Sequence, residues 1–435
     1  TPINIGRNPS PTVLYYAMNR GLASVMVTGS HIPEDQNGIK YAKPSGEVLK
    51  SDEQSILENV ALARFQEYIK TDTESQFQDD GKFKFNLQHN LSKADEERVS
   101  REEYKARLEP FRGLLEGLRI GYYLQTGVGS DLGVEIYRDI LGAEVHSFGR
   151  KTEFFSLATA TVRPDAIAEV HAEMNRENLD ITMTTDGDSD RPLMFYRVYV
   201  DGKPTSEVKF VTGDILGLLT VTGMENLGID IGAVAMPETA NPSIKEVLQD
   251  EQGKPFVYTN VGSPYVIAQM NIYLEMMKDE KSDIKGAIVG WESNGGFMTA
   301  TDIVYKGQTI KAIPSRDAMS PMMFTLALMK SRGVNIQDLL NQYQRYFVNT
   351  ATIKAFPREV SSKIIEYLTP KDVKDMQEVT FNDDNTISIL MGDATVKVVS
   401  ASNETTLSFL KRSLNSGISF ILFIATNKQA SEKER

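Results

Sequence analysis

Three carboxylates alternate with other residues in one short segment, and their spacing suits a divalent cation. The segment is Asp186-Gly-Asp-Ser-Asp-Arg191, and it follows an apolar run. Carboxylates at i, i+2 and i+4 can converge on one hard cation, and Mg²⁺ prefers such oxygen ligands. An EF-hand does not fit, because its sixth position needs Gly and its twelfth needs Glu, where this chain has Arg191 and Arg197. An acidic solvated turn is the simpler alternative, but closely spaced carboxylates repel unless something neutralises them. We therefore expect Asp186, Asp188 and Asp190 to hold a metal ion.

A serine with acid–base neighbours follows another apolar, β-branched run. Ser30 comes after Gly29, with His31 beside it and Lys40 further along the chain. This pattern suits a nucleophilic or phosphorylated hydroxyl on an exposed turn. His31 is a candidate general acid or base, and Lys40 is a candidate for offsetting phosphate charge or moving a proton. A turn-capping serine is the usual explanation when such a segment stands alone.

A polar turn between glycines is the third candidate. It is Gly290-Trp-Glu-Ser-Asn-Gly-Gly296. Glu292, Ser293 and Asn294 carry groups that hydrogen-bond sugar hydroxyls. A simple turn is an equally good explanation of this segment alone.

A basic, hydroxyl-rich segment near the C-terminus is the fourth candidate. Its cationic side chains, hydroxyls and backbone N–H groups suit a phosphate-binding loop, although a basic surface loop is an equal alternative. The candidate phosphate-binding residues are Lys411, Arg412, Ser413, Asn415 and Ser416.

Strand-like and helix-like segments alternate through the chain and position these motifs. Such alternation favours an α/β fold. Apolar runs predict strands, and apolar residues at helical spacing predict helices. The expected strands are 24–28, 118–124, 179–184, 287–289 and 418–424, and the expected helices are 52–70, 134–141, 211–224, 315–331 and 336–347. Residues 71–100 are polar and predict a loop or hairpin.

Composition excludes several classes of protein. The chain has 435 residues, of which 41% are hydrophobic and 24% charged, as in an ordinary globular protein. It has no cysteine, so disulfides, thiolate catalysis and Cys–zinc sites are excluded, and a reducing cytoplasm is expected. The net charge is −12 and no basic domain or stripe is visible, so no nucleic-acid partner is expected. The longest apolar stretch, 418–425, is far short of the ~20 residues that span a bilayer, so no membrane association is expected.

Taken together and in this order, the four motifs resemble those of the α-D-phosphohexomutase superfamily, which includes phosphomannomutase and phosphoglucomutase. The segment from Val27 to Pro33 is similar to the T-A/G-S-H-N/I-P phosphoserine loop of that superfamily. The Asp186–Arg191 segment is similar to its D-G-D-G-D-R metal loop, with Ser189 in place of the second Gly. The third and fourth motifs correspond to its sugar-selecting and phosphate-binding loops, and Leu414 replaces a Gly in the latter.

The resemblance implies four domains around a central cleft. The first three would be related α/β units with mixed sheets, and the fourth a smaller α+β domain. Boundaries near residues 117, 205 and 350 give domains at 1–117, 118–205, 206–350 and 351–435. In this alignment the N-terminal part of domain 1, including an Arg-bearing loop, has no counterpart before Thr1.

The resemblance also implies an activity, which is reversible phosphoryl transfer between C1 and C6 of a mannose or glucose phosphate. Ser30 would carry the phosphoryl group and, with the three aspartates, hold Mg²⁺. Hexose 1,6-bisphosphate would be the intermediate and activator, and Arg191 would contact the transferring phosphate or the sugar. A monomer or homodimer is expected. The alternatives are a phosphohydrolase that uses Asp186 and Asp188, and a non-catalytic sugar-phosphate-binding protein.

Overall fold

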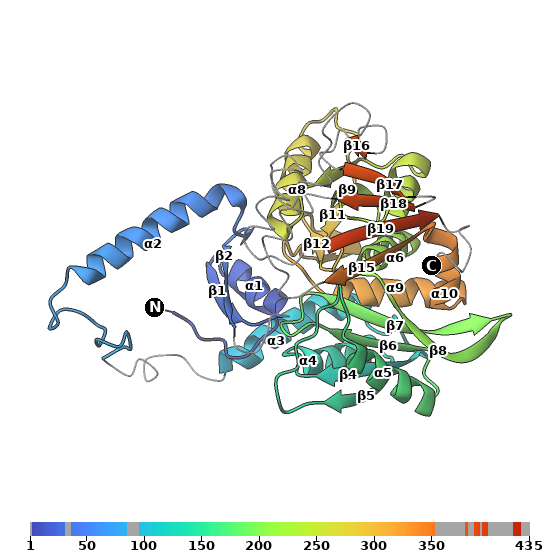
Figure 1. The fold of residues 1–435 in the computed structure, drawn as a ribbon, viewed down its shortest axis with the longest axis horizontal. Coiled ribbons are helices and arrows are strands. Elements are labelled where there is room, and N and C mark those ends of the chain that lie inside the picture. Colours follow the sequence, from blue (N-terminus) through green and yellow to red (C-terminus); the bar gives the residue numbers. More distant parts are fainter. Residues whose placement is uncertain are drawn as a thin grey trace.

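The fold is a mixed α/β arrangement of several separate sheets, as the sequence predicts (Figure 1). The computed structural model describes residues 2–30, 36–84, 95–352, 379–381, 387–391, 394–398 and 421–427. No helix in these ranges is both long and apolar enough to cross a membrane. The domain boundaries expected above stay a prediction.

A small antiparallel sheet carries the serine motif. It has the order β1-β2-β3, from Ser24–Thr28, Gly38–Lys43 and Gly46–Glu47. Helix α1, Ser10–Asn19, packs against this sheet. In β1 and β2 Met26 pairs with Lys40 and Thr28 pairs with Gly38, so Ser30 and Lys40 lie near the same end of the sheet.

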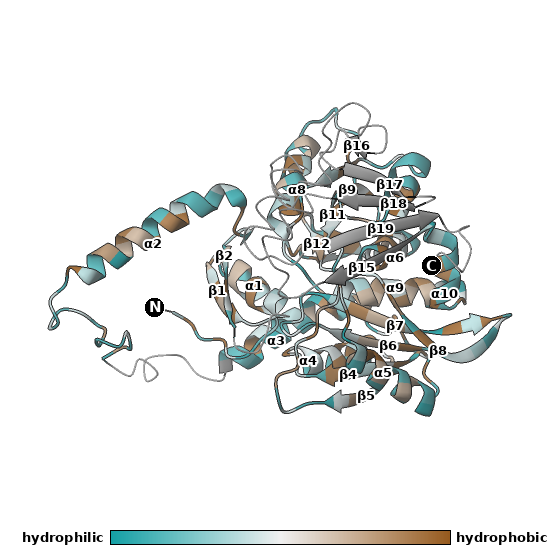
Figure 2. Ribbon diagram, in the orientation of Figure 1, coloured by the Kyte–Doolittle hydropathy of each residue, from teal (hydrophilic) through white to brown (hydrophobic). Residues whose placement is uncertain are grey.

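Helix α2, Glu53–Tyr68, extends away from the rest of the molecule (Figure 1). The helix is predicted correctly, because its apolar residues recur at helical spacing. Apolar residues along it are nevertheless exposed, among them Leu57 and Phe65, and Figure 2 shows hydrophobic stretches along the helix. Among the described residues of α2 none is buried. Periodicity therefore reveals the helix here but not its packing.

The polar segment 71–100 differs in part from the expected loop or hairpin. Phe77 and Phe83 form an isolated antiparallel bridge, which agrees with a hairpin-like turn. Helix α3, Asp95–Leu108, however, begins inside the segment. Its first turns are rich in charged residues, so no apolar pattern marks where it starts.

The second sheet positions the aspartate motif. Its order is β5-β4-β6-β7-β8, with β5, β4 and β6 parallel and β7 and β8 antiparallel to their neighbours. Its strands are Glu144–Arg150, Arg119–Gln125, Ile181–Thr185, Pro192–Val200 and Lys203–Val211, and its helices are α4, Ser130–Glu135, and α5, Pro164–Arg176. A π-helical turn, Ile136–Ile140, continues α4, so this helix begins earlier than expected. Strand β6 is buried along its whole length and ends at Thr185, so Asp186 lies at the carboxyl end of a central strand.

The third sheet positions the Glu292 motif. Its order is β10-β9-β11-β12, and only β12 runs antiparallel to its neighbour. These strands are Phe256–Thr259, Ile231–Pro237, Ala287–Trp291 and Phe297–Thr299, followed by the hairpin of β13, Ile303–Tyr305, and β14, Gln308–Ile310. The helices are α6, Gly213–Asn226; α7, Pro242–Lys245; α8, Ser263–Met277; α9, Met319–Arg332; and α10, Ile336–Tyr343. Glu292 directly follows β11.

The C-terminal strands form an antiparallel sheet in the order β15-β19-β18-β17-β16. They are Tyr346–Thr352, Ile421–Asn427, Ala394–Val398, Ile387–Met391 and Val379–Phe381. Within the described residues, the strand expected at 418–424 is present as Ile421–Asn427, and residues 418–420 lie outside the described ranges. Helix α10 ends at Tyr343, earlier than predicted, because β15 takes up the residues from Tyr346 onward.

One continuous apolar core runs from α1 and α3 through β4 to α6 and α9. Helices α6 and α9 pack closely, and a Cβ added to Gly223 would lie 2.3 Å from the carbonyl oxygen of Phe324. This core fixes the second and third sheets relative to each other, and therefore the loops that follow β6 and β11.

Candidate active site

Ser30 lies against the aspartate motif although 156 positions separate the two in sequence. Its Oγ donates a hydrogen bond to Oδ2 of Asp186 at 2.9 Å, and its backbone N–H donates to Oγ1 of Thr28 at 2.9 Å. Ser30 has a φ of 44°, in the left-handed region that non-glycine residues rarely adopt. Such strain persists where surrounding structure holds it, and it is common at functional sites.

The small residues of the aspartate motif allow this close approach. A Cβ added to Gly187 would lie 2.4 Å from the carbonyl oxygen of Ser30, so only glycine fits there. Ser189 has a φ of 57°, which explains why glycine suits this position in the resembling loops. Its Oγ accepts hydrogen bonds from the N–H of Gly129 at 3.1 Å and from Oγ1 of Thr185 at 2.9 Å. These two bonds offset part of the conformational cost.

The three aspartates form a buried cluster that suits a cation. Asp186, Asp188 and Asp190 are at most 1% exposed, and each offers an oxygen within 4.8 Å of the others. Among the described residues, Oδ1 of Asp188 and Oδ1 of Asp190 have no hydrogen-bond partner. Unsatisfied buried carboxylate oxygens are costly, and a hard divalent cation is the ligand that satisfies them. The donor set therefore fits Mg²⁺.

Lys40 brings a positive charge from β2 into the aspartate cluster. Its Nζ lies 2.5 Å from Oδ2 of Asp188, 2.7 Å from Oδ2 of Asp190 and 3.2 Å from Oγ of Ser10. Burial lowers the pKa of Lys40, but the attraction of Asp190 and Asp188 outweighs it, so the net shift is upward. The side chain is therefore an ammonium in the metal-free protein.

Ser10 and Thr28 also contact the cluster, although neither was a candidate from the sequence. Both hydroxyls donate to Oδ2 of Asp188, at 3.0 Å from Ser10 and 3.1 Å from Thr28. Ser10 stands in a Pro-Ser-Pro segment at the start of α1. That segment signals a helix start, and nothing local indicates its distant carboxylate partner.

Arg191 contacts the aspartates of its own loop through both its backbone and its side chain. The backbone N–H groups of Asp190 and Arg191 each donate to Oδ1 of Asp186 at 3.2 Å. The Nε of Arg191 lies 3.8 Å from Oδ2 of Asp186 and 3.7 Å from Oδ1 of Asp190. The guanidinium thus lies close to the carboxylates that would meet a transferring phosphate.

The sugar-loop candidates lie at the end of β11. Glu292 is 6% exposed, and its Oε2 accepts from Nδ2 of Asn294 at 3.3 Å. The hydroxyls of Ser293 and Thr239 are 2.8 Å apart, and Oγ1 of Thr159 donates to the carbonyl oxygen of Asn294 at 2.8 Å. Contacts from two other segments therefore hold this polar turn in place.

Arg316 connects the aspartate motif to the turn that carries Glu292, and no sequence motif indicates it. Its Nε donates to Oδ2 of Asp190 and its Nη1 to Oε2 of Glu292, both at 3.0 Å. The expected helix 315–331 placed Arg316 in a first helical turn. The structure begins α9 at Met319, because the carboxylate of Asp317 accepts the N–H of Met319 at 3.0 Å. Arg316 is therefore free of the helix and reaches both loops.

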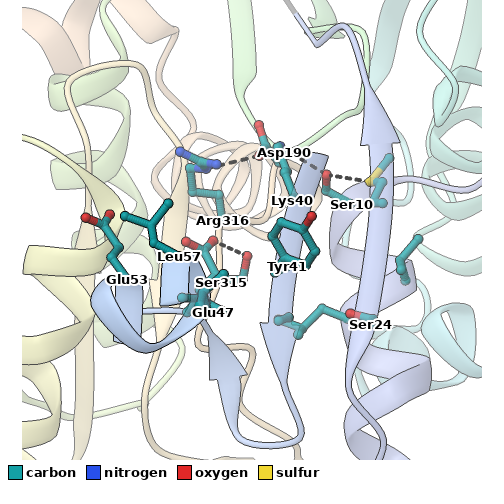
Figure 3. Close-up of a pocket in the computed structure, with 16 residues that line it drawn as sticks. Ser10, Ser24, Lys40, Tyr41, Glu47, Glu53, Leu57, Asp190, Ser315 and Arg316 are labelled. Atoms are coloured by element: carbon teal, nitrogen blue, oxygen red, sulfur yellow. Dashed lines mark hydrogen bonds and ion pairs between the residues drawn. The ribbon is translucent and has the colours of Figure 1, made fainter. Parts of the chain in front are cut away.

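A cavity of about 440 Å³ opens beside this charged row (Figure 3). Lys40, Asp190 and Arg316 line one end of it, and Figure 3 shows Arg316 and Lys40 converging on Asp190. Apolar side chains from α1, β1 and α2 line much of the rest, among them Leu14 and Leu57. The cavity adjoins the carboxylate cluster on the side of α1 and α2.

The structure thus brings together most of the candidates from the first three motifs. The described cluster contains Ser30, Lys40, Asp186, Asp188, Asp190 and Arg191, and Arg316 connects it to Glu292. Ser293 and Asn294 lie in the same turn as Glu292. The other candidates lie outside the described residues, namely His31, Lys411, Arg412, Ser413, Asn415 and Ser416. A hydroxyl beside three carboxylates and three cationic groups has the composition that metal-assisted phosphoryl transfer requires.

Two parts of the chain match models of known protein domains. Residues 2–67 match "Phosphoglucomutase/phosphomannomutase, alpha/beta/alpha domain I". Residues 212–346 match domain III of the same description. The first match contains Ser30 and Lys40, and the second contains Glu292 and Arg316.

Relatives that align with most of this chain agree with these domain matches. A phosphomannomutase of Sinorhizobium fredii is 30% identical over 367 residues, which cover 84% of this chain and 69% of that protein. A phosphoglucosamine mutase of Aliarcobacter butzleri is 26% identical over 427 residues, covering 95% of this chain and 84% of that protein.

Solved structures show the same fold. A phosphoglucomutase/phosphomannomutase family protein from Burkholderia thailandensis superposes with a TM-score of 0.63 at 15% identity, covering 99% of this chain and 80% of its own. The Aspergillus fumigatus N-acetylphosphoglucosamine mutase, solved with GlcNAc-6P and magnesium, gives 0.55 at 14% identity, covering 98% and 90%.

Proposed function

This chain belongs to the α-D-phosphohexomutase superfamily, and from that premise we propose that it transfers a phosphoryl group reversibly between C1 and C6 of a hexose phosphate. The proposed route passes through a phosphoserine at Ser30 and a hexose 1,6-bisphosphate intermediate. Mannose and glucose phosphates are the proposed substrates.

The observation that carries this proposal is the contact between Ser30 and the aspartate cluster. Oγ of Ser30 lies 2.9 Å from Oδ2 of Asp186, and two neighbouring carboxylate oxygens are buried without a hydrogen-bond partner among the described residues. A phosphoryl group on that hydroxyl would stand beside the cation that these oxygens suit. A hydrolase that uses Asp186 as nucleophile would need no such serine.

Asp186, Asp188 and Asp190 would hold Mg²⁺ together with a phosphoserine oxygen. Bound there, the ion withdraws charge from the transferring phosphoryl group. Lys40 reaches the same carboxylates and would offset the remaining negative charge as the phosphoryl group moves.

The reaction consists of two phosphoryl transfers of opposite direction. In the first, the bond between Oγ of Ser30 and phosphorus breaks, and the free hydroxyl of the hexose phosphate forms a new bond to that phosphorus. The hydroxyl proton leaves to a base, for which His31 is the proposed carrier, and Lys40, as an ammonium, is proposed to supply the proton that the departing Oγ of Ser30 takes up. The bisphosphate then turns around, and its other phosphate returns to Ser30, so that no phosphate is lost. Added hexose 1,6-bisphosphate would act as activator by phosphorylating an unphosphorylated Ser30.

The remaining candidates would bind the substrate. Glu292, Ser293 and Asn294 would hydrogen-bond sugar hydroxyls from the end of β11, and Arg191 would contact the transferring phosphate or the sugar. Binding of the non-transferring phosphate is proposed for Lys411, Arg412, Ser413, Asn415 and Ser416. Binding of both the sugar hydroxyls and the non-transferring phosphate would keep the reacting hydroxyl in place during each transfer.

A coupled mutase assay tests the proposal. The protein is incubated with Mg²⁺, a trace of hexose 1,6-bisphosphate, and either mannose 1-phosphate or glucose 1-phosphate, with glucosamine 1-phosphate in parallel. We expect the 6-phosphate to form, and we expect Ser30→Ala to lower turnover by about 10³-fold or more, because the phosphoryl carrier is gone. Ser55→Ala, an exposed position on α2, serves as the matched control and should keep full turnover.

Two results would contradict the proposal. Turnover that survives Ser30→Ala would remove the phosphoserine from the mechanism. Release of inorganic phosphate without formation of the 6-phosphate, unchanged in Ser30→Ala, would point to a hydrolase. Mass spectrometry of protein treated with hexose 1,6-bisphosphate supplies an independent readout, since the added phosphate should map to Ser30.

A further inference from the structure

Arg316 lies between two loops that follow strands of different sheets, and it contacts both loops. Its guanidinium donates to Asp190 and to Glu292 at the same distance, 3.0 Å, and its side chain is 13% exposed. The arginine has a fixed planar fork, so it suits two carboxylates at once. No other described cation joins Asp190 directly to Glu292.

The chain around Arg316 is shaped to hold it there. A Cβ added to Gly296 would lie 2.6 Å from Cγ and Cδ of Arg316, so the missing side chain leaves room for the arginine stem. The neighbouring Asp317 is 3% exposed and is anchored by Oη of Tyr104 and Oγ of Ser320, each at 2.5 Å. The backbone of Arg316 is therefore fixed on one side, and its stem on the other.

Several cationic side chains lie close to Asp190. Its Oδ2 accepts from both Lys40 and Arg316, at 2.7 and 3.0 Å. A divalent ion on the aspartate cluster would bring two more positive charges close to the guanidinium. Like charges at such distances repel, and a metal-bound carboxylate is a weaker acceptor, so the contact between Arg316 and Asp190 would loosen. The guanidinium would then retain its contact with Glu292.

We propose that Arg316 is a positioning residue that couples cation binding at Asp186–Asp190 to the binding of the sugar by Glu292. With the cation bound, Arg316 pairs more closely with Glu292 and holds its carboxylate in one orientation for the sugar hydroxyls. Coupling between two sites is reciprocal, so the sugar phosphate would tighten cation binding by the same factor. The inference rests on the proposed function only in assigning the cation and the sugar phosphate to these two loops.

The test measures binding without turnover. Mg²⁺ and glucose 6-phosphate are titrated by calorimetry into the Ser30→Ala protein, each alone and each in the presence of the other. We expect each ligand to tighten the other by about fivefold or more, in the range of ordinary couplings between sites. Trp291, the single tryptophan of the chain, precedes Glu292 and gives a fluorescence readout of the sugar loop.

The decisive variant adds Arg316→Gln to that protein. We expect Mg²⁺ alone to bind several-fold more tightly, because a competing positive charge has left Asp190, while glucose 6-phosphate binds more weakly. The coupling factor should fall close to one. Arg316→Lys keeps a charge but no fork, so Mg²⁺ affinity should change little while coupling still falls. Arg345→Gln removes a partly exposed arginine that pairs with Glu246 and Glu251 and is the matched control.

Opposite signs separate coupling from structural damage. A variant Arg316→Gln that binds both ligands more weakly would show a merely structural role and overturn the inference. An unchanged coupling factor in Arg316→Gln would overturn it as well, while leaving the proposed function intact. Failure of Ser30→Ala protein with Arg316 intact to bind either ligand would instead contradict the proposed function itself.

Discussion

Two carboxyl groups four positions apart in one loop have pKa values that their surroundings shift in opposite directions. Burial, with the neighbouring charges of Asp190 and Asp188, raises the pKa of Asp186. Burial also acts to raise the pKa of Asp190, but the positive charges of Arg316, Lys40 and Arg191 outweigh it and hold that pKa below its usual value. Placement of cations therefore decides which carboxylate is ionised most readily when no metal is bound.

Burial acts alone at Tyr273 on α8, which makes it a clean test of the same physics away from the site. Burial raises the pKa of Tyr273 to about 12. Because the folded value lies above the unfolded value of about 10, the stability linked to this group is complete below pH 10 and is lost between about pH 10 and 12. Through Tyr273 the original protein should lose about 1–2 kcal/mol of unfolding free energy over this pH range, and we expect Tyr273→Phe to avoid that loss.

Urea unfolding at pH 8, 10 and 11 measures this difference. The gap in unfolding free energy between the original protein and Tyr273→Phe should shift in favour of the variant as the pH rises. Tyr68→Phe, on the exposed helix α2, is the matched control and should show no such shift. Parallel pH curves for the original protein and Tyr273→Phe would contradict the assignment.

At the scale of elements, local pattern predicted the strands that precede the first three motifs and several helices, but not what they touch. Other elements, among them α5, α8, β7 and β9, were not expected. Strands β1, β6 and β11 were expected because short apolar runs end at Gly or Asp, and those runs place Ser30, Asp186 and Glu292 at strand ends. The start of α9 was missed because the hydrogen bond from the N–H of Met319 to the carboxylate of Asp317 leaves no mark on the apolar pattern. Arg316 was missed because its partner Asp190 is 126 positions away, and spacing carries no information over such a distance.

Helix α6 supports the turn that carries Glu292 and Asn294, which is the proposed sugar loop, through its first residue. A Cβ added to Gly213 would lie 2.2 Å from the backbone nitrogen of Gly295 and 2.4 Å from the carbonyl carbon of Asn294. Gly213→Ala must therefore push the loop or the helix aside, and small displacements at a binding site lower affinity and rate. We expect KM for the hexose phosphate to rise by about tenfold or more, with Mg²⁺ binding in the Ser30→Ala background nearly unchanged.

Steady-state kinetics and Mg²⁺ calorimetry on Gly213→Ala check this expectation. Asn226→Ala, at the other end of α6, is the control, since it removes an exposed contact with Ser331 and leaves the sugar loop alone. A normal KM in Gly213→Ala would mean that the loop adjusts without cost. A parallel loss of Mg²⁺ binding would mean that the damage spreads beyond the sugar loop.

At the scale of the whole molecule, the site depends on contacts between segments that are distant in sequence. The four-part α/β architecture was expected from the resemblance of the motifs, and the second and third sheets, which are mixed, agree with it. Among the polar contacts that join the parts, the approach of Ser30 to the aspartates was expected from the resemblance. The contacts of Arg316 and Tyr104 were not expected, because each uses an ordinary residue. Tyr104 on α3 and Asp317 before α9 are 213 positions apart, and neither carries a local signal of the other.

The Tyr104–Asp317 contact gives the last prediction. Both side chains are buried, and burial with the charge of Asp317 raises the pKa of Tyr104, so the hydroxyl stays a donor across the working pH range. Tyr104→Phe leaves one oxygen of Asp317 with a weaker set of donors in a buried setting. We expect a loss of about 1–3 kcal/mol in unfolding free energy, measured by urea unfolding.

The same variant should also act on the site, because Asp317 fixes the backbone next to Arg316. We expect Tyr104→Phe to raise KM for the hexose phosphate severalfold even at temperatures where the protein is fully folded. Tyr15→Phe is the matched control, since its ring meets that of Tyr104 edge-on at a centroid distance of 6.5 Å and lies in the same core. If Tyr104→Phe lowers stability but leaves KM as in Tyr15→Phe, the contact serves folding alone, and the placement of Arg316 does not depend on it.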